Sequence, residues 1–208
     1  MDKFAMIIFG ASGDLTKRKL MPALYSLFRE KRLTGDFHIL GIGRTIYSDE
    51  DYRSYISGEL RTFVKSEEQD AALMEAFISH LCYLPMDPAK EEGYAMLRQR
   101  LVELTNEVDP DNLLFYLATP PSLYGVVPLH LKAAGLNTPH SRIIVEKPFG
   151  YDLESARELN KFMLLFSKNI RFTVLTIFSV KRQRKMCWLS VLPMVFSSLS
   201  GTGIISTT

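Results

Sequence analysis

Two glycines follow the first apolar run of the sequence, in the segment GASGDLTKRK (residues 10–19). Gly10 and Gly13 have no Cβ, so the backbone there can adopt a positive φ and bring N–H groups close to a phosphate. Lys17 and Arg18 can add positive charge near that anion. The spacing is not G-x-G-x-x-G, so an ordinary tight turn between a strand and a helix is the alternative. The apolar run before the loop and the helical pattern after it favour a dinucleotide site.

Arg44 follows the second apolar run, in the segment ILGIGRT (residues 39–45). NAD-binding folds usually place an Asp or Glu at the end of this strand, where it holds the ribose 2′-hydroxyl. A carboxylate would repel a 2′-phosphate, whereas a planar guanidinium can bind it through paired hydrogen bonds. Arg44 therefore favours NADP over NAD. A surface arginine after a strand is the alternative interpretation.

A further group of polar residues lies in IIVEKPFG (residues 143–150), where Glu146 and Lys147 follow a buried run. A lysine at the end of a strand can donate hydrogen bonds to a substrate oxygen or phosphate. Pro148 can hold the next turn rigidly through its fixed φ. A solvated charge pair is an equally good interpretation of Glu146 and Lys147.

Tyr124 follows the run LFYLAT (residues 114–119) and can stack or hydrogen-bond in the cofactor crevice, although such a tyrosine more often packs in a core. No metal site is expected, because the histidines share no ligand spacing: His38, His80, His130 and His140.

Apolar runs alternate with helical patterns along the chain. Strands are expected over residues 4–9, 37–43, 81–86, 112–119 and from 141 onward. Helices are expected over residues 20–28, 48–64, 70–80, 89–104, 121–135 and 153–166. Ser48 is the expected N-cap of the second helix, and Pro128 is expected to break the fifth. This alternation predicts an α/β fold with a doubly wound, mostly parallel sheet, which binds ligands beyond the carboxyl ends of its strands.

The composition is that of a soluble globular protein, with 208 residues, 47% of them hydrophobic and 23% charged. A net charge of +2 gives no argument for a nucleic-acid partner. Cys82 and Cys187 form no disulfide framework, so we expect a reducing, cytoplasmic compartment. Basic residues precede an apolar run in residues 181–201, but Pro193 interrupts that run. The run is also shorter than the roughly 20 residues that span a bilayer, so no membrane anchor is expected.

Together, several stretches resemble glucose-6-phosphate dehydrogenases in that family's order and spacing. They are FGASGDLTKRKLMPALYSLF, ILGIGRT, LFYLATPPSLY and RIIVEKPFGYDLESARELN. The resemblance implies a Rossmann-like coenzyme domain followed by a large α+β domain, in a homo-oligomeric enzyme. It also implies oxidation of glucose 6-phosphate to 6-phosphogluconolactone with NADP+, the first step of the pentose phosphate pathway.

The family's site residues can be carried over by position. Arg44 would bind the 2′-phosphate, Tyr124 would line the cofactor site, and Lys147 would contact both coenzyme and sugar. The resemblance gives the coenzyme loop as Gly10, Ala11, Ser12, Gly13, Asp14, Leu15, Thr16 and Lys17. Two alternatives remain open: a non-catalytic NADP-binding fragment, or a Rossmann sugar oxidoreductase of the glucose–fructose oxidoreductase type. The second type usually carries a G-x-G-x-x-G loop, which is absent here.

The end of the sequence departs from the family. After ELN the family continues with a segment close to RIDHYLGKE, which binds the sugar phosphate, and then with the catalytic histidine and aspartate. Translated one base out of register, residues 174–182 can be recoded as RIDHFLGKE and residues 191–208 as RFANG, Ile or Val, and FEPLWNRNYIDH. We therefore expect an NADP-binding domain over residues 1–166 and an out-of-frame tail over 167–208 that is not a domain. The frameshift is expected between residues 160 and 169, and the chain by itself is expected to be inactive.

Overall fold

Six strands form one parallel sheet in the order β3-β2-β1-β4-β5-β6. The computed structural model describes residues 4–33, 36–106, 112–138, 140–146 and 171–175. The strands are β1 (Phe4–Phe9), β2 (Phe37–Gly43), β3 (Leu81–Pro85), β4 (Leu113–Leu117), β5 (Arg142–Glu146) and β6 (Arg171–Leu175). The predicted α/β fold with a parallel sheet is confirmed.

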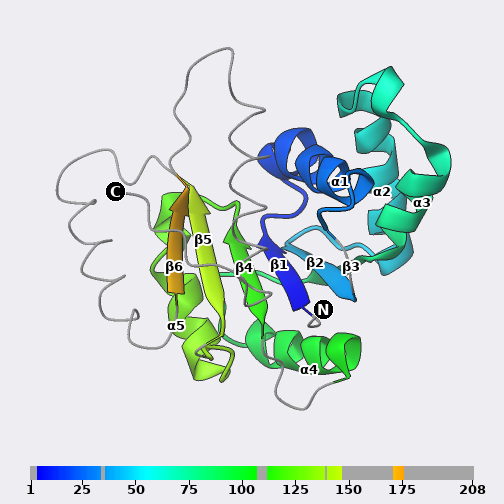
Figure 1. Cartoon of the computed structure of the whole chain (residues 1–208). Coiled ribbons are helices and arrows are strands. Elements are labelled where there is room, and N and C mark those ends of the chain that lie inside the picture. The colour runs from blue at the N-terminus through cyan, green and yellow to red at the C-terminus, as the bar shows by residue number, and fades with distance from the viewer. Residues whose placement is uncertain (1–3, 34–35, 107–111, 139, 147–170, 176–208) are drawn as a thin grey trace.

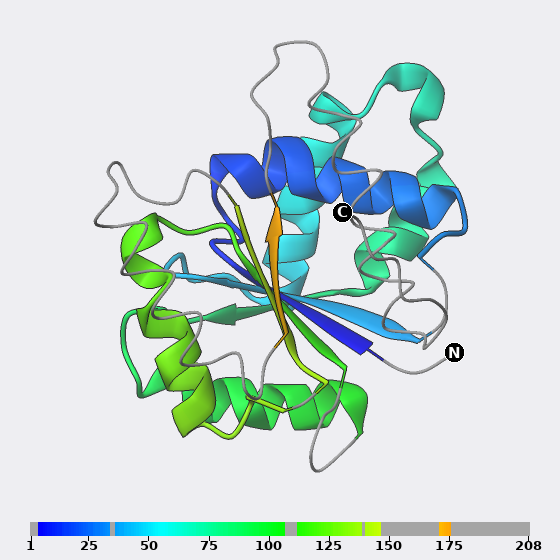
Figure 2. The same cartoon turned by 60° about the vertical axis from the view of Figure 1, so that its left-hand side comes forward.

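Helices cover both faces of this sheet (Figure 1). They are α1 (Met21–Arg29), α2 (Asp49–Phe63), α3 (Ala71–Ser79), α4 (Gly93–Thr105) and α5 (Val126–Ala133). Figure 2 shows the sheet between two layers, with the blue and cyan helices on one side and the green helices α4 and α5 on the other. The fold therefore has three layers.

The central strand β1 is buried on both faces because its side chains alternate between the two layers. Met6 and Ile8 pack in the core on the side of α1, α2 and α3. Ile7 and Phe9 pack in the core on the side of α4 and α5. An apolar residue at every position of β1 is therefore what a doubly covered sheet requires.

Local sequence features explain where the helices begin. Ser48 is the N-cap of α2, and it forms a reciprocal capping box with Asp51, as the sequence predicts. Pro22 lies in the first turn of α1, directly after a π-helical turn over Thr16–Leu20.

The helix expected over residues 121–135 is instead a 3-10 turn at Pro121–Leu123 followed by α5. Pro128 lies in the first turn of α5, where its missing N–H leaves no gap in the hydrogen-bonding pattern.

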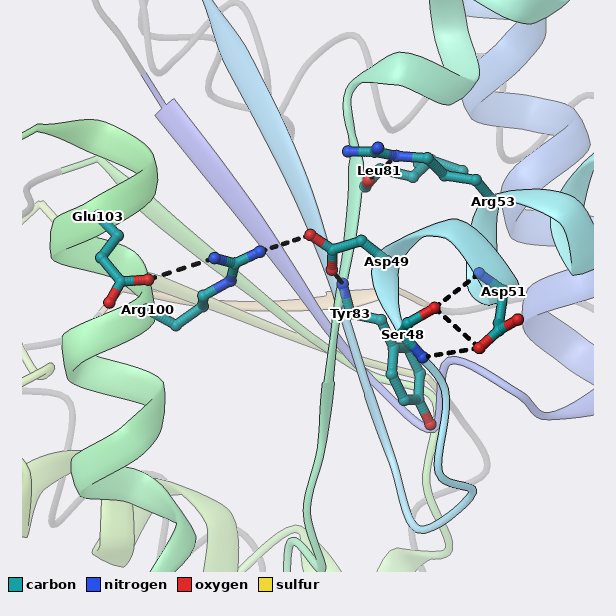
Figure 3. Close-up of polar contacts among 8 residues, drawn as sticks. All are labelled: Ser48, Asp49, Asp51, Arg53, Leu81, Tyr83, Arg100 and Glu103. Atoms are coloured by element: carbon teal, nitrogen blue, oxygen red, sulfur yellow. Dashed lines mark hydrogen bonds and ion pairs between the residues drawn. The ribbon is translucent and has the colours of Figure 1, made fainter.

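Side chains from α2 cover the free edge of β3 (Figure 3). The Asp49 carboxylate accepts a hydrogen bond from the backbone N–H of Tyr83 at 2.7 Å, and Arg53 Nε donates to the backbone oxygen of Leu81 at 2.8 Å. The second oxygen of Asp49 contacts the Arg100 guanidinium, which extends from α4 on the opposite face. Such a cover occupies backbone groups that could otherwise pair with another strand.

The other edge strand, β6, extends the sheet beyond residue 166 by pairing in parallel with β5. Its sequence RFTVL is rich in aromatic and β-branched residues, which favour strands. The helix expected over residues 153–166 and most of the predicted out-of-frame tail lie outside the described residues. Among the helices that the structure describes, none is long and apolar enough to cross a membrane.

Candidate functional site

The glycine loop begins where the strand order reverses, between β1 and β4. Gly10 follows β1 with a φ of +87°, and a Cβ placed on it would lie 2.3 Å from the backbone oxygen of Ala118, which follows β4. The Gly10 and Ala11 N–H groups both donate to the Ile42 oxygen at 2.9 Å. Only glycine fits at position 10, because both the backbone conformation and the contact with Ala118 exclude a side chain.

The loop then turns tightly into a helix. The Gly13 N–H and the Thr16 hydroxyl both donate to the Gly10 oxygen at 3.0 Å, and the Lys17 N–H donates to the Gly13 oxygen at 3.2 Å. Helical structure begins at Asp14. The first N–H groups of a helix have no intrahelical acceptor, so they are available to a phosphate. The loop therefore has the geometry of an anion cradle at the ligand-binding edge of the sheet.

The charged side chains of the loop are engaged by neighbouring groups. Lys17 Nζ lies 3.5 Å from a carboxylate oxygen of Glu59 on α2. Arg18 pairs with Asp14 and lies over the Phe63 ring, with its guanidinium carbon 5.1 Å from the ring centroid. Their positive charges are therefore partly neutralised, and the backbone N–H groups remain the better-placed partners for a phosphate.

Arg44 follows β2, the neighbour of β1, at the same edge of the sheet. Its side chain is exposed, and within the described part of the chain it makes no hydrogen bond or ion pair. A Cβ placed on the preceding Gly43 would lie 3.3 Å from the Ser12 Oγ, so this turn and the glycine loop are in contact. The structure thus brings Arg44 and the loop together, while its contact with a 2′-phosphate stays a prediction.

A cluster of four tyrosines, Tyr47, Tyr52, Tyr55 and Tyr83, supports the glycine loop. The sequence patterns do not predict this cluster. The Tyr52 hydroxyl donates to the Ala11 oxygen at 3.3 Å, and the Tyr55 hydroxyl donates to the Ser12 oxygen at 3.4 Å. The Tyr47 and Tyr83 rings complete the cluster, with Tyr83 4.7 Å from Tyr52 and 5.4 Å from Tyr47 between centroids. The helical spacing of Tyr52 and Tyr55 indicates a shared face, but nothing in the sequence connects that face to the loop.

The Tyr52 and Tyr83 hydroxyls are neutral donors near neutral pH. Burial raises the pKa of Tyr52 well above its ordinary value, because it removes the phenol from water. Burial likewise raises the pKa of Tyr83 to about 12, and the neighbouring Tyr47 acts in the same direction, while the Ser12 side chain opposes the shift. These phenols therefore stay protonated and can donate, Tyr52 to the Ala11 oxygen and Tyr83 to the Thr45 oxygen.

The remaining residues at this edge differ in their surroundings. The Thr119 hydroxyl follows β4 and is buried with no hydrogen-bond partner among the described residues, so it is a further polar group at the switch point. Tyr124 is 6% exposed and packs with α4 and α5 in the apolar core, and its contact with a cofactor stays a prediction. Lys147 lies just beyond β5 and outside the described residues.

Two of the histidines pack against aromatic rings. His80 stacks on Phe37 with ring centroids 4.1 Å apart, and its Nδ1 lies 2.9 Å from the Phe37 oxygen. His130 meets the Tyr94 ring edge-on at 5.0 Å. Within the described ranges, no group of three or more His, Cys, Asp or Glu side chains is placed to hold a metal ion.

The strand order, the glycine loop at its switch point and the flanking helices define a dinucleotide-binding domain of the Rossmann type. Residues 7–170 match the family described as "Glucose-6-phosphate dehydrogenase, NAD binding domain". The chain belongs to this family, and the resemblance found in the sequence is confirmed.

Known relatives agree with this assignment. The chain is 46% identical over 159 residues to the glucose-6-phosphate 1-dehydrogenase of Aggregatibacter actinomycetemcomitans, covering 74% of this chain and 32% of that protein. It is 38% identical over 159 residues to the enzyme of Treponema pallidum (strain Nichols), covering 74% and 31% respectively. The chain therefore spans about a third of the length of these curated relatives.

Solved structures show the same fold. A structure described as glucose-6-phosphate dehydrogenase in complex with its substrate glucose-6-phosphate matches with a TM-score of 0.72 and 37% identity, over 84% of this chain and 36% of that one. The glucose-6-phosphate 1-dehydrogenase of Mycobacterium avium matches with a TM-score of 0.71 and 28% identity, over 82% and 35%. The family description supports a nicotinamide dinucleotide as the cofactor of this domain.

Proposed function

We propose that the chain is the coenzyme domain of an NADP-linked glucose-6-phosphate dehydrogenase. The choice of NADP over NAD rests on Arg44, which is exposed beside the glycine loop and has no ion-pair partner in the described structure. A guanidinium with free donors can bind a 2′-phosphate, whereas the acid typical of NAD sites would repel it.

In the whole enzyme, the proposed reaction oxidises D-glucose 6-phosphate to 6-phospho-D-glucono-1,5-lactone, the first step of the pentose phosphate pathway. The coenzyme accepts a hydride from C1 of the sugar, and a general base must remove the proton of the C1 hydroxyl. Lys147, just beyond β5, is proposed to contact both coenzyme and sugar. The resemblance assigns the general base to a histidine held by an aspartate in the family sequence that follows this domain.

The cytoplasm is the proposed location of the whole enzyme, and homo-oligomerisation is its proposed assembly.

The 208-residue polypeptide by itself is proposed to bind NADP without turnover. It aligns with about a third of its curated relatives, and no counterpart of the catalytic histidine and aspartate is recognised in its sequence. The family match over residues 7–170 favours this interpretation over a glucose–fructose oxidoreductase.

A one-base shift in the reading frame is proposed between residues 160 and 169. The match to the family ends at residue 170, directly after that window. Sequencing the gene and its transcript across these codons tests the proposal. A one-base correction that restores RIDHFLGKE and the later family segments supports it, whereas a sequence that no single-base shift converts to them refutes it.

Titration calorimetry with NADP+ and NAD+ tests the coenzyme assignment. The wild-type chain is expected to bind NADP+ saturably and NAD+ more weakly. Arg44→Ala is expected to weaken NADP+ binding about tenfold or more and to leave NAD+ binding nearly unchanged, since a lost charge-assisted contact is worth about 1.5–3 kcal/mol. Lys132→Ala, a change of an exposed lysine in the last turn of α5, is the control. Equal losses for both coenzymes in Arg44→Ala would refute the assignment.

A further inference from the structure

Tyr83 joins the two loops of the coenzyme site. Its side chain extends from β3 and donates a hydrogen bond from the hydroxyl to the Thr45 oxygen at 3.0 Å, next to Arg44. The Tyr83 ring also packs against Tyr52, with ring centroids 4.7 Å apart, and the Tyr52 hydroxyl donates to the Ala11 oxygen in the glycine loop. Tyr83 therefore binds the turn that carries Arg44 through its hydroxyl, and it contacts the support of the glycine loop through its ring.

The close approach of these groups depends on a glycine. A Cβ on Gly43 would lie 2.7 Å from the Tyr83 hydroxyl oxygen and 3.3 Å from the Ser12 Oγ. Gly43 has an ordinary φ, so the need for glycine here comes from space alone. Because Gly43 has no side chain, the Tyr83 phenol can pass close to its backbone and reach the Thr45 oxygen.

Tyr83 is itself held at both ends. Its backbone N–H donates to the Asp49 carboxylate at 2.7 Å (Figure 3). The residue is 4% exposed, and its ring packs against Tyr47 and Tyr52. In the same cluster, the Tyr55 hydroxyl donates to the Ser12 oxygen. Because the ring is fixed, its hydroxyl can restrain the two loops relative to one another.

We propose that Tyr83 is a positioning residue that fixes the Arg44 turn against the glycine loop and thereby sets the preference of the chain for NADP over NAD. The inference rests on the proposed function, since it assumes that Arg44 binds the 2′-phosphate. The glycine loop takes the phosphates common to both coenzymes, while the Arg44 turn takes the group that differs. A restraint that acts on the turn therefore affects NADP more than NAD.

Coenzyme binding to the 208-residue chain tests this inference. Tyr83→Phe removes the hydroxyl and keeps the ring. We expect the Kd for NADP+ to rise about fivefold, since one hydrogen bond is worth about 1 kcal/mol net, and the Kd for NAD+ to change less than about twofold. Tyr25→Phe is the matched control, because this buried phenol instead donates to the Glu68 oxygen at 3.2 Å. An unchanged ratio of the two Kd values in Tyr83→Phe would overturn the proposal.

A second variant perturbs the same contact while keeping the hydroxyl. Gly43→Ala places a methyl group against the Tyr83 phenol and is expected to displace it from Thr45. We expect the same selective loss of NADP+ affinity as in Tyr83→Phe. If Gly43→Ala binds both coenzymes as the wild type does, the proposed restraint is wrong.

Hydrogen–deuterium exchange without coenzyme separates this inference from the proposed function. Amides of residues 43–46 are expected to exchange faster in Tyr83→Phe than in the wild type, and at the wild-type rate in Tyr25→Phe. Unchanged exchange in Tyr83→Phe would overturn the positioning role. A wild-type chain that binds neither coenzyme would instead overturn the proposed function and, with it, the claimed effect on coenzyme preference, whatever the exchange result.

Discussion

The carboxylate of Asp49 accepts a hydrogen bond from the backbone N–H of Tyr83 at 2.7 Å, and this contact joins the first turn of α2 to the edge strand β3. The other carboxylate oxygen contacts Arg100 on α4, so one side chain connects the two helical layers around the edge of the sheet (Figure 3). The Asp49 side chain is 26% exposed and the Arg100 side chain 28% exposed. Partial burial makes these contacts less screened by water than those of a surface ion pair.

Removing this carboxylate is expected to destabilise the domain. Asp49→Ala leaves the Tyr83 N–H and the Arg100 guanidinium without their partner, and we expect a loss of about 1–3 kcal/mol in the free energy of unfolding. Urea denaturation measures the change. Glu103→Ala removes only the more exposed partner of Arg100 and is expected to cost less than about 0.5 kcal/mol. Equal losses in the two variants would contradict a special role for Asp49.

Replacing glycine by alanine is expected to have opposite effects at two positions. Gly10→Ala forces a side chain into a left-handed backbone region and against the Ala118 oxygen, so we expect a loss of about 2 kcal/mol or more and loss of coenzyme binding. Gly58 lies within α2 with nothing within 4 Å of its missing Cβ. Gly58→Ala is expected to add about 0.5–1 kcal/mol, because alanine favours helix. Thermal unfolding and coenzyme titration of both variants test the pair.

The capping box at the start of α2 is expected to stabilise the domain at neutral pH, and this stabilisation is expected to be lost in acid. Hydrogen bonds from the Ser48 side chain and backbone lower the pKa of Asp51. The contribution is therefore present above the ordinary carboxyl pKa of about 4 and is lost as the pH falls through the lower folded value. We expect Asp51→Asn to melt below the wild type at neutral pH, and the difference to shrink in acid. A difference that grows in acid would contradict the assignment.

The buried tyrosines should make the domain sensitive to alkali. Burial raises the pKa of Tyr83 to about 12, and it also raises the pKa of Tyr52 and of Tyr94. A phenol whose pKa is raised on folding stabilises the fold fully below its unfolded pKa of about 10, and this contribution is lost as the pH rises through the folded value. We expect unfolding above about pH 10, with phenolate absorbance rising together with loss of helical circular dichroism. Tyrosine ionisation well before unfolding would contradict this prediction.

Much of the fold follows from local patterns. The β1 run FAMIIF has an apolar residue at every position, which indicates a strand buried on both faces, and the capping box at Ser48 fixes the start of α2. The fifth helix is predicted less well, because Pro128 fits either a break within a helix or a place in its first turn. That choice depends on the path of the chain after β4, which packing determines.

The sequence by itself determined the class of fold and the glycine loop, and it predicts a role for Arg44, because each depends on residue type and on spacing along the chain. The tertiary structure decided which side chains support that loop. Tyr52 and Tyr55 on α2 are distant in the sequence from Tyr83 on β3 and from the loop, and they meet next to Ala11 and Ser12 only when α2 packs on the sheet. The structure also showed that Gly10 is required by its contact with Ala118, more than a hundred residues later in the chain. Contacts between distant segments arise from packing, and no local pattern specifies them.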